Sequence, residues 1–327
     1  MCLFPLALNG AEFQRYEFSQ PHMGTTFRIV LYSRDPEVAR TAASAAFDRI
    51  EELNGIMSDY KSDSELMNLV HAAGGAPMKI GDDLFTILKI SKDAAKASDG
   101  AFDISLGPVI RLWRRARRQR ELPDAAKLAE ALKLVGCDKL ELDETAHTAR
   151  LAVAGMVLDL GGIGKGYAAD AAITVLKRHN IDRALVAAGG DITCSNAPPD
   201  AEGWAVGIAP LASPENAPKI VLMLANGSVS TSGDAEQFVE IGGVRYSHIV
   251  DPKTGLGLTG HKNVTVVGPN GTTADWMTKV VSVQGEKGFK LIDATDGVAS
   301  LIVRQGEKGE EQFQSARWKE LKFKQEK

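Results

Sequence analysis

Short runs of alternating apolar and polar residues dominate the chain, and longer runs with helical spacing separate them. Residues 25–32 alternate in this way, with Phe27, Ile29 and Leu31 on one face, which predicts a strand with one buried face. Residues 36–54 repeat apolar positions every three or four residues, so we expect a helix there. The pattern therefore mixes strands and helices from the first elements onward.

The first predicted helix has recognisable ends. Asp35 is a plausible N-cap, and Pro36 suits the first helical position. Gly55 is expected to end this helix. Further helices are expected at residues 64–71, 82–98, 109–120 and 124–134, from the glycine turn near residue 164 to residue 177, and at 272–281 and 285–294.

The remaining periodic segments predict strands. They are residues 139–142, 147–153, 156–160, 184–188, 204–208, 220–224, 228–232, 238–241, 244–247, 264–268 and 299–303. Gly242 and Gly243 form a two-residue hairpin signal. Strand 156–160, the helix that follows it and strand 184–188 are expected to form a parallel unit with a right-handed crossover.

No change of composition marks a linker, and no short repeat is present. The predicted fold class is therefore α+β, with mixed sheets and packed helices in a single domain, or in two intimately packed halves. We expect an N-terminal arm or the remnant of an export signal at residues 1–19, the domain at 20–312 and a charged C-terminal tail at 313–327. Residues 3–8 are apolar but lack the basic start of a complete signal peptide.

A glycine-rich turn at residues 157–170 is the most suggestive stretch of the sequence. An apolar run ends in Asp159, glycines surround Lys165, and an alanine-rich helical pattern follows. Such a turn lets backbone N–H groups approach an anion closely at a helix N-terminus. The stretch is neither a Walker A loop, because Gly166 follows the lysine, nor a dinucleotide fingerprint, because its glycines have the spacing G-x-G-x-G. By itself it is equally consistent with an ordinary strand-to-helix turn.

Charge and cysteine content exclude several classes of protein. The net charge of −4 and the pI near 5.9 argue against a general nucleic-acid binder. The three cysteines, Cys2, Cys137 and Cys194, have neither metal-ligand spacing nor the even number of a disulfide framework. Nothing approaches 18 consecutive apolar residues, so no membrane span is expected.

Residues 109–120 carry six arginines around Trp113. This cluster suggests either a nucleic-acid patch or a solvated helix face with Leu112 and Trp113 packed beneath arginine stems. The acidic balance of the whole chain favours the solvated face. A scaffold that binds an acidic partner through the cluster is a further alternative.

Seven polar motifs occur at the ends of predicted elements, where functional groups commonly lie. They are Met23-Gly24-Thr25, Ser58-Asp59-Tyr60, Ala101-Phe102-Asp103, the turn from Asp159 to Tyr167, Gly189-Gly190-Asp191, the segment from His248 to Gly255, and Thr273-Ala274-Asp275. In this order and spacing they resemble the ApbE family, the FAD:protein FMN transferases, over roughly residues 20–312. The resemblance implies an enzyme that uses Mg²⁺ and FAD, attaches FMN to a Ser or Thr hydroxyl in a flavinylation motif of a target protein, and releases AMP.

The resemblance also implies roles for individual residues. FAD contacts are expected at Met23, Tyr60, Ala101, Phe102, Asp103, Asp159, Lys165, His248 and Ile249. Metal ligands are expected at the Gly162 carbonyl, Asp275 and Thr278, and hard oxygen ligands of this kind suit Mg²⁺. Metal, lysine and backbone donors would neutralise a pyrophosphate under attack. Asp159 and His248 are competing candidates for the general base, which stays unassigned.

One residue departs from the family pattern. Lys279 stands where a threonine is usual, and an ammonium beside Mg²⁺ would be repelled. Either Thr278 supplies the hydroxyl while Lys279 turns away, for example toward a phosphate, or the metal affinity is altered, or Lys279 is a solvated helix residue.

Two further functions and the location are left open at this stage. An Mg²⁺-dependent FAD pyrophosphatase and a non-catalytic flavin-binding protein are the alternatives to transfer. The resemblance implies an exported, periplasmic or membrane-associated bacterial protein, and a cytoplasmic location is the alternative because no complete signal peptide is seen.

Overall fold

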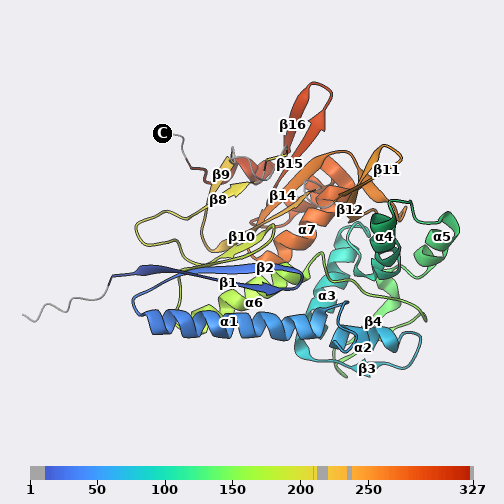
Figure 1. Ribbon diagram of the computed structural model, residues 1–327, viewed down its shortest axis with the longest axis horizontal. Coiled ribbons are helices and arrows are strands. Elements are labelled where there is room, and N and C mark those ends of the chain that lie inside the picture. Colours follow the sequence, from blue (N-terminus) through green and yellow to red (C-terminus); the bar gives the residue numbers. More distant parts are fainter. Residues whose placement is uncertain (1–11, 209, 212–219, 234–237, 325–327) are drawn as a thin grey trace, which may run out of the picture.

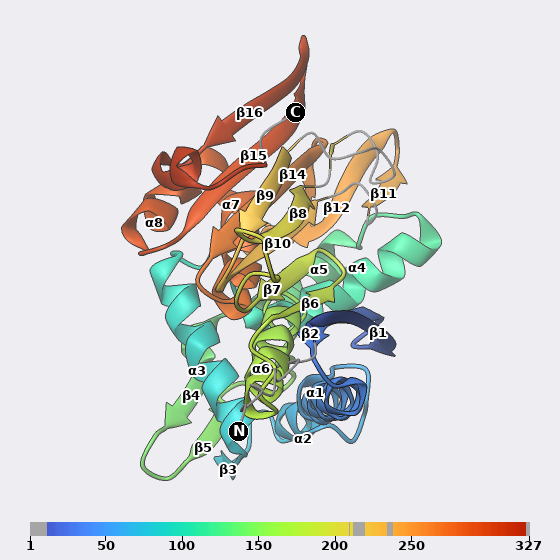
Figure 2. The same cartoon turned by 90° about the vertical axis from the view of Figure 1, so that its left-hand side faces the viewer.

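The computed structural model describes residues 12–208, 210–211, 220–233 and 238–324. The predicted signal remnant at residues 3–8 and Cys2 lie outside these ranges. A large sheet runs through the centre of the molecule, with helices on one side of it and shorter hairpins around it (Figures 1 and 2).

The large sheet has eight strands in the order β1-β2-β6-β7-β10-β14-β15-β16, and every neighbouring pair is antiparallel. Its strands are β1 (Gln14–His22), β2 (Thr25–Ser33), β6 (Ala184–Ala188), β7 (Asp191–Cys194), β10 (Gly227–Gly233), β14 (Lys262–Gly268), β15 (Ala299–Gly306) and β16 (Gly309–Gln314). Three smaller sheets pair β3 (Met78–Lys79), β5 (Thr148–Leu151) and β4 (Leu140–Asp143); β11 (Phe238–Ile241), β12 (Val244–Val250) and β13 (Gly257–Thr259); and β8 (Trp204–Ile208) with β9 (Ile220–Leu224).

The helices follow the predicted positions closely. They are α1 (Pro36–Met57), α2 (Glu65–His71), α3 (Asp82–Ala97), α4 (Gly107–Gln119), α5 (Ala125–Lys133), α6 (Gly164–Arg178), α7 (Gly271–Gln284) and α8 (Phe289–Ala294). Single 3-10 turns occur at η1 (Ile104–Leu106), η2 (Cys137–Lys139), η3 (Gly285–Gly288) and η4 (Ala316–Glu320). The α+β fold class is confirmed.

Both faces of the large sheet are covered. The predicted inner face of β2, with Phe27, Ile29 and Leu31, is buried in a core shared with α1, α6 and α7. Because side chains alternate across a strand, Val30 points to the other face, into a second core that contains Trp204 of β8. Figure 1 shows α1 and α6 side by side along the sheet, and the two helices pack against each other.

A third apolar cluster joins α4 and α5 to the β11–β13 sheet. Trp113 of α4 is buried there, and its indole N–H donates to the Gly255 carbonyl oxygen at 2.7 Å. Four arginines of the predicted cluster are exposed around it: Arg111, Arg115, Arg118 and Arg120. The solvated-face interpretation is therefore confirmed for these four, while Arg114 and Arg117 are half-buried.

The predicted strand at residues 156–160 is wrong, and so is the parallel unit built on it. This segment is largely buried, but it belongs to no sheet. The Asp159 N–H donates to the Ile104 carbonyl at 2.8 Å, and Val157 packs directly on Gly107 at the start of α4. A continuous apolar run marks burial on all sides, and burial alone does not require a neighbouring strand.

The end of the first helix also differs from the prediction. Helix α1 continues through Gly55 to Met57. Met57 is buried, and that packing outweighs the roughly 1 kcal/mol that a glycine costs inside a helix. Strand β1 crosses the predicted domain start at residue 20, and β16 crosses the predicted end at residue 312.

Helices α6 and α7 are locked together at their N-terminal turns. Asp170 of α6 accepts hydrogen bonds from the backbone N–H groups of Gly271 and Thr272, at 2.6 and 2.8 Å, at the start of α7. A methyl group added at Gly166 would lie only 2.2 Å from the Gly271 carbonyl oxygen. This backbone contact, which only glycine permits, fixes the position of the first turns of both helices.

Candidate active site

Lys165 projects from the first turn of α6 into a cluster of acidic side chains. Its Nζ lies 3.1 Å from Asp191 Oδ2, 3.9 Å from Asp275 Oδ2 and 3.4 Å from the Gly161 carbonyl oxygen. Burial alone would lower the pKa of this ammonium, but Asp275 and Asp191 outweigh burial and raise it. Lys165 is therefore a permanent cation in the folded protein.

Asp275 lies at the centre of the cluster and is fully buried. Its carboxylate accepts hydrogen bonds from the Gly166 backbone N–H at 3.1 Å and from the Lys279 ammonium. Burial would raise the pKa of this carboxyl, yet Lys165 and Lys279 hold it below its ordinary value. The cluster thus holds an ionised carboxylate between two cations, a pattern that buried ion pairs require.

Lys279 points into this cluster, so the predictions that it turns away or is a solvated helix residue are wrong. Besides Asp275, its Nζ donates to Ser232 Oγ at 3.0 Å and to Thr278 Oγ1 at 3.1 Å. Thr278 is itself buried, and its hydroxyl donates to the Asp275 carbonyl at 2.7 Å. A methyl group added at Gly162 would lie 3.4 Å from Lys279 Cε, so the lysine stem runs along the glycine turn.

The residues expected to hold Mg²⁺ do not fit a divalent ion in this arrangement. The carboxylate of Asp275 and the hydroxyl of Thr278 both contact the Lys279 ammonium. Two unit charges 4 Å apart interact by about 4 kcal/mol at an effective dielectric constant of about 20, so a divalent ion beside an ammonium would be repelled by about 8 kcal/mol.

A second group of side chains surrounds Asp159. Its carboxylate accepts from Arg114 at 2.8 Å and from the Gly161 N–H at 2.8 Å. Arg114 also pairs with Asp59 at 2.6 Å, and its guanidinium lies 4.3 Å from the centre of the Tyr60 ring. Burial and the neighbouring Asp59 raise the pKa of Asp159, and Arg114 opposes them. Arg114 thus joins two of the expected FAD contacts.

The other predicted contacts occupy different settings. Tyr60 is 78% exposed, whereas Phe102 is buried and its ring lies 5.9 Å from that of Trp276. Asp103 caps η1 by accepting from the Ser105 N–H at 2.7 Å, and it also accepts from Cys137. Ala101 is buried beside Phe102.

Met23 and the two β12 residues complete the predicted set. Met23 lies in the left-handed turn between β1 and β2, next to Gly24. Thr25, at the start of β2, approaches the turn at Gly189. His248 is half-buried and Ile249 is buried in β12, a strand that contacts α7.

The structure therefore brings some of the predicted site residues into direct contact with one another, whereas the others lie outside this group of contacts. Gly162, Lys165, Asp275 and Thr278 each contact another member of this set or Lys279. Asp159 lies on the glycine turn at residues 157–170, which also carries Gly162 and Lys165. Sequence reasoning missed Arg114, Ser230 and Ser232, and it gave Asp191 no role. Ser230 donates to Asp191 and is buried like it. The signal for the serines was the polar alternation at residues 228, 230 and 232 of a buried strand.

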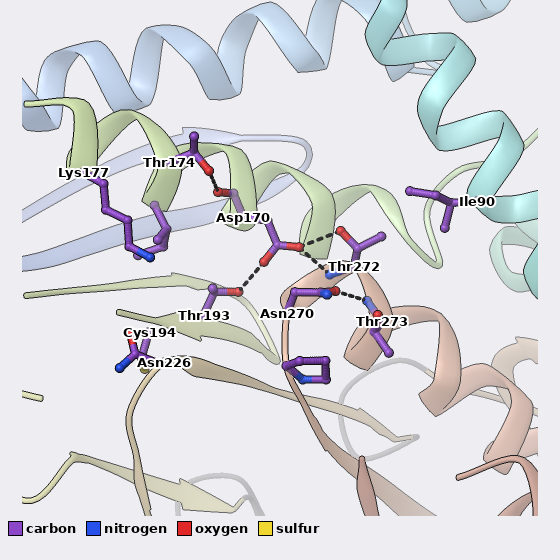
Figure 3. A pocket seen from close by; sticks show the side chains of 12 residues that line it. Ile90, Asp170, Thr174, Lys177, Thr193, Cys194, Asn226, Asn270, Thr272 and Thr273 are labelled. Atoms are coloured by element: carbon purple, nitrogen blue, oxygen red, sulfur yellow. Dashed lines mark hydrogen bonds between the residues drawn. The ribbon is translucent and has the colours of Figure 1, made fainter. Parts of the chain in front are cut away.

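An open pocket of about 490 Å³ lies beside this site, at the outer side of the α6–α7 contact. Figure 3 shows Asp170 bonded to Thr272 and Thr193 in its wall, with Lys177 at its edge. None of the predicted FAD or metal contacts lines it. Two of its polar side chains, Asp170 and Asn270, accept hydrogen bonds from the first residues of α7, so we interpret it as structural.

Lys165 in the first turn of α6, together with Asp191 of β7 and with Asp275 and Lys279 of α7, defines a class of site. Fixed cations beside a glycine turn suit a ligand that carries phosphate groups. The fold and the site thus define an α+β protein that binds a phosphate-bearing ligand.

Comparisons with known proteins identify the family. The sequence profile of the ApbE family matches residues 23–302, and this chain belongs to that family. It is 30% identical to a FAD:protein FMN transferase of Klebsiella pneumoniae over 88% of this chain and 89% of the relative. It is 33% identical to a FAD:protein FMN transferase of Treponema pallidum over 90% of this chain and 85% of the relative.

Solved structures agree with this assignment. The flavin transferase ApbE of Vibrio cholerae superposes with a TM-score of 0.85 at 25% identity, covering 95% of this chain and 100% of that one. The apo flavinyl transferase ApbE of Pseudomonas stutzeri gives a TM-score of 0.83 at 28% identity, over 94% of this chain and 97% of that one. In the part of the chain that the structure describes, no helix is long and apolar enough to cross a membrane.

Proposed function

We propose that this protein transfers FMN from FAD to a Ser or Thr hydroxyl of a target protein and releases AMP. The observation that carries the proposal is the convergence of Lys165 and Lys279 on Asp275 beside the glycine turn. Membership of the ApbE family and the names of the related transferases supply the substrate.

The proposed reaction exchanges the phosphoanhydride bond of FAD for a phosphoester bond to the target protein. The acceptor hydroxyl oxygen forms a bond to the phosphorus of the FMN half, the bond from that phosphorus to the bridging oxygen breaks, and AMP leaves with the bridging oxygen. Lys165 and Lys279 are fixed cations that stabilise charge developing on the diphosphate. Tyr60 and Phe102 are the aromatic groups that we expect to contact the flavin nucleotide.

The hydroxyl proton has two candidate acceptors on this chain. Asp159 is held in one orientation by Arg114 and by the Gly161 N–H, and its raised pKa brings it nearer to the range of a general base. His248 is half-buried in β12. The pH profiles of single variants at these two positions would assign the role.

Mg²⁺ belongs to the reaction that the resemblance predicts, with Gly162, Asp275 and Thr278 as its ligands. Since Lys279 lies among these groups, no step of the proposed reaction is assigned to a metal. An exported, periplasmic or membrane-associated setting is likewise part of the proposal, with a cytoplasmic one as its alternative.

Incubation with FAD and a flavinylation substrate of a related transferase tests the function. We expect AMP release together with protein-bound flavin, seen as a fluorescent band after denaturing electrophoresis. AMP and free FMN without labelled protein would favour the pyrophosphatase. Flavin binding without AMP release, with and without divalent metals, would indicate a non-catalytic flavin-binding protein.

Arg114 offers a test of how the site is held together. Arg114→Ala removes the charged hydrogen bonds to Asp159 and Asp59, and each such bond contributes roughly 1.5–3 kcal/mol. We expect the Kd for FAD, measured by quenching of flavin fluorescence, to rise by about tenfold or more. Arg115→Ala, an exposed neighbour on the same helix, is the control and should bind FAD as the native protein does.

A further inference from the structure

We propose that the Lys279 ammonium is the resident cation of this active site, in the place among the Asp275 and Thr278 oxygens that the family resemblance assigns to Mg²⁺. The protein then carries its own positive charge at this position and needs no divalent ion there. The catalytic part of this inference rests on the proposed function, whereas the binding part does not.

The hydrogen bonds of Lys279 are the first support. An ammonium has three N–H donors, and Lys279 Nζ has three oxygen partners: Asp275 Oδ1, Ser232 Oγ at 3.0 Å and Thr278 Oγ1 at 3.1 Å. These partners come from both α7 and β10. The side chain is only 17% exposed, so its position is built by the surrounding fold.

The hydroxyl groups around the ammonium are themselves fixed. Thr278 Oγ1 donates to the Asp275 carbonyl at 2.7 Å and lies 2.7 Å from Ser232 Oγ. Thr278 and Asp275 have no exposed surface. A metal ion could therefore reach the same oxygens only if Lys279 left them, and its departure would break three hydrogen bonds.

The charge balance is the second support. Asp191 and Asp275 carry two negative charges, and Lys165 and Lys279 carry two positive charges in direct contact with them. The group is neutral without any ion. With threonine at position 279, the same group would carry one net negative charge and would attract a cation. The residue at position 279 thus decides whether the site recruits a metal.

The packing of the stem is the third support. An added methyl group at Gly162 would lie 3.4 Å from Lys279 Cε and 3.5 Å from its Cγ. The lysine therefore runs beside the glycine turn and delivers its charge close to the Gly162 residue that the resemblance names as the third ligand. One side chain lies against all three expected ligand residues.

Binding of Mn²⁺, followed by electron paramagnetic resonance, tests the inference without relying on turnover. The titration is done first on the protein alone and then with saturating FAD. For the native protein we expect no saturable Mn²⁺ binding below about 1 mM. Lys279→Thr should acquire one Mn²⁺ site at least about tenfold tighter than any site of the native protein. Lys290→Thr, which changes an exposed lysine of α8, is the matched control and should behave as the native protein does.

The native protein alone can overturn the inference, so the result does not depend on how well the variant folds. Saturable binding of one Mn²⁺ to the native protein below about 1 mM, in the absence of FAD, would contradict the inference. Measurement of AMP release is a second, independent test. AMP release by the native protein should be insensitive to EDTA, whereas Lys279→Thr should require added metal. If no AMP is released under any condition, the proposed function fails. The Mn²⁺ titration still decides whether Lys279 or a metal ion occupies the position beside Asp275 and Thr278.

Discussion

Replacing Asp275 with alanine is expected to lower the free energy of unfolding by about 3–5 kcal/mol and to abolish AMP release. The variant removes the only carboxylate that contacts both Lys165 and Lys279 among the described residues. Two largely buried ammonium groups would then face each other without their shared counter-charge. Urea denaturation measures the stability, and a coupled AMP assay measures the activity.

Two controls separate charge from volume in this experiment. Glu286→Ala removes an exposed carboxylate just beyond α7 and should leave both readouts unchanged. The double variant Asp275→Asn with Lys279→Met removes both partners of one ion pair. It should recover part of the lost stability, because neutral packing replaces an unpaired buried charge. Native-like stability of Asp275→Ala would contradict the role of Asp275 as the shared counter-charge.

Replacing Gly166 with alanine is expected to lower the stability and the AMP release of the protein almost as much as Asp275→Ala does. The new methyl group would lie 2.2 Å from the Gly271 carbonyl oxygen and 2.9 Å from Asp275 Cβ. Neither is the flexible end of a side chain, so α6 and α7 must move apart. Overpacking of this kind costs about 1–3 kcal/mol or more, and a shift of about 1 Å near the reacting groups can lower turnover by roughly a hundredfold.

Gly164→Ala is the matched control for this prediction. It lies two residues away on the same helix, where the nearest atom to an added methyl group is Leu160 Cβ at 4.0 Å. We expect this variant to keep native stability in urea and native AMP release. Equal behaviour of the two variants would show that the contact between Gly166 and Gly271 does not hold the site in place.

The sequence predicted the elements whose signals are local. Capping residues and apolar spacing located the helices, and alternation located β2 with its correct inner face. Strands β1, β7 and β16 were missed because their residues are polar, small or charged. What makes them strands is pairing with neighbours that lie far away in the sequence, and no local pattern reports such pairing.

The site shows the same division between local and non-local information. Lys165 and Asp275 were identified through the resemblance, and the structure brings them together. The direction of Lys279 could not be predicted, because it depends on Ser232, a residue 47 positions earlier in the chain. Arg114 was missed for a related reason. The segment 109–120 carries six arginines, and only the fold selects which of them reaches Asp159, 45 residues after Arg114.

The two edges of the large sheet bear on how a target protein can approach. Edge strands β1 and β16 expose charged side chains, with Arg15 and Glu17 on one and Glu310 and Glu311 on the other. Charges on an edge strand oppose pairing with a further strand. A target that docked by strand addition would have to bury them. We therefore expect an acceptor segment to enter as a loop, presenting its hydroxyl to the glycine turn without extending the sheet.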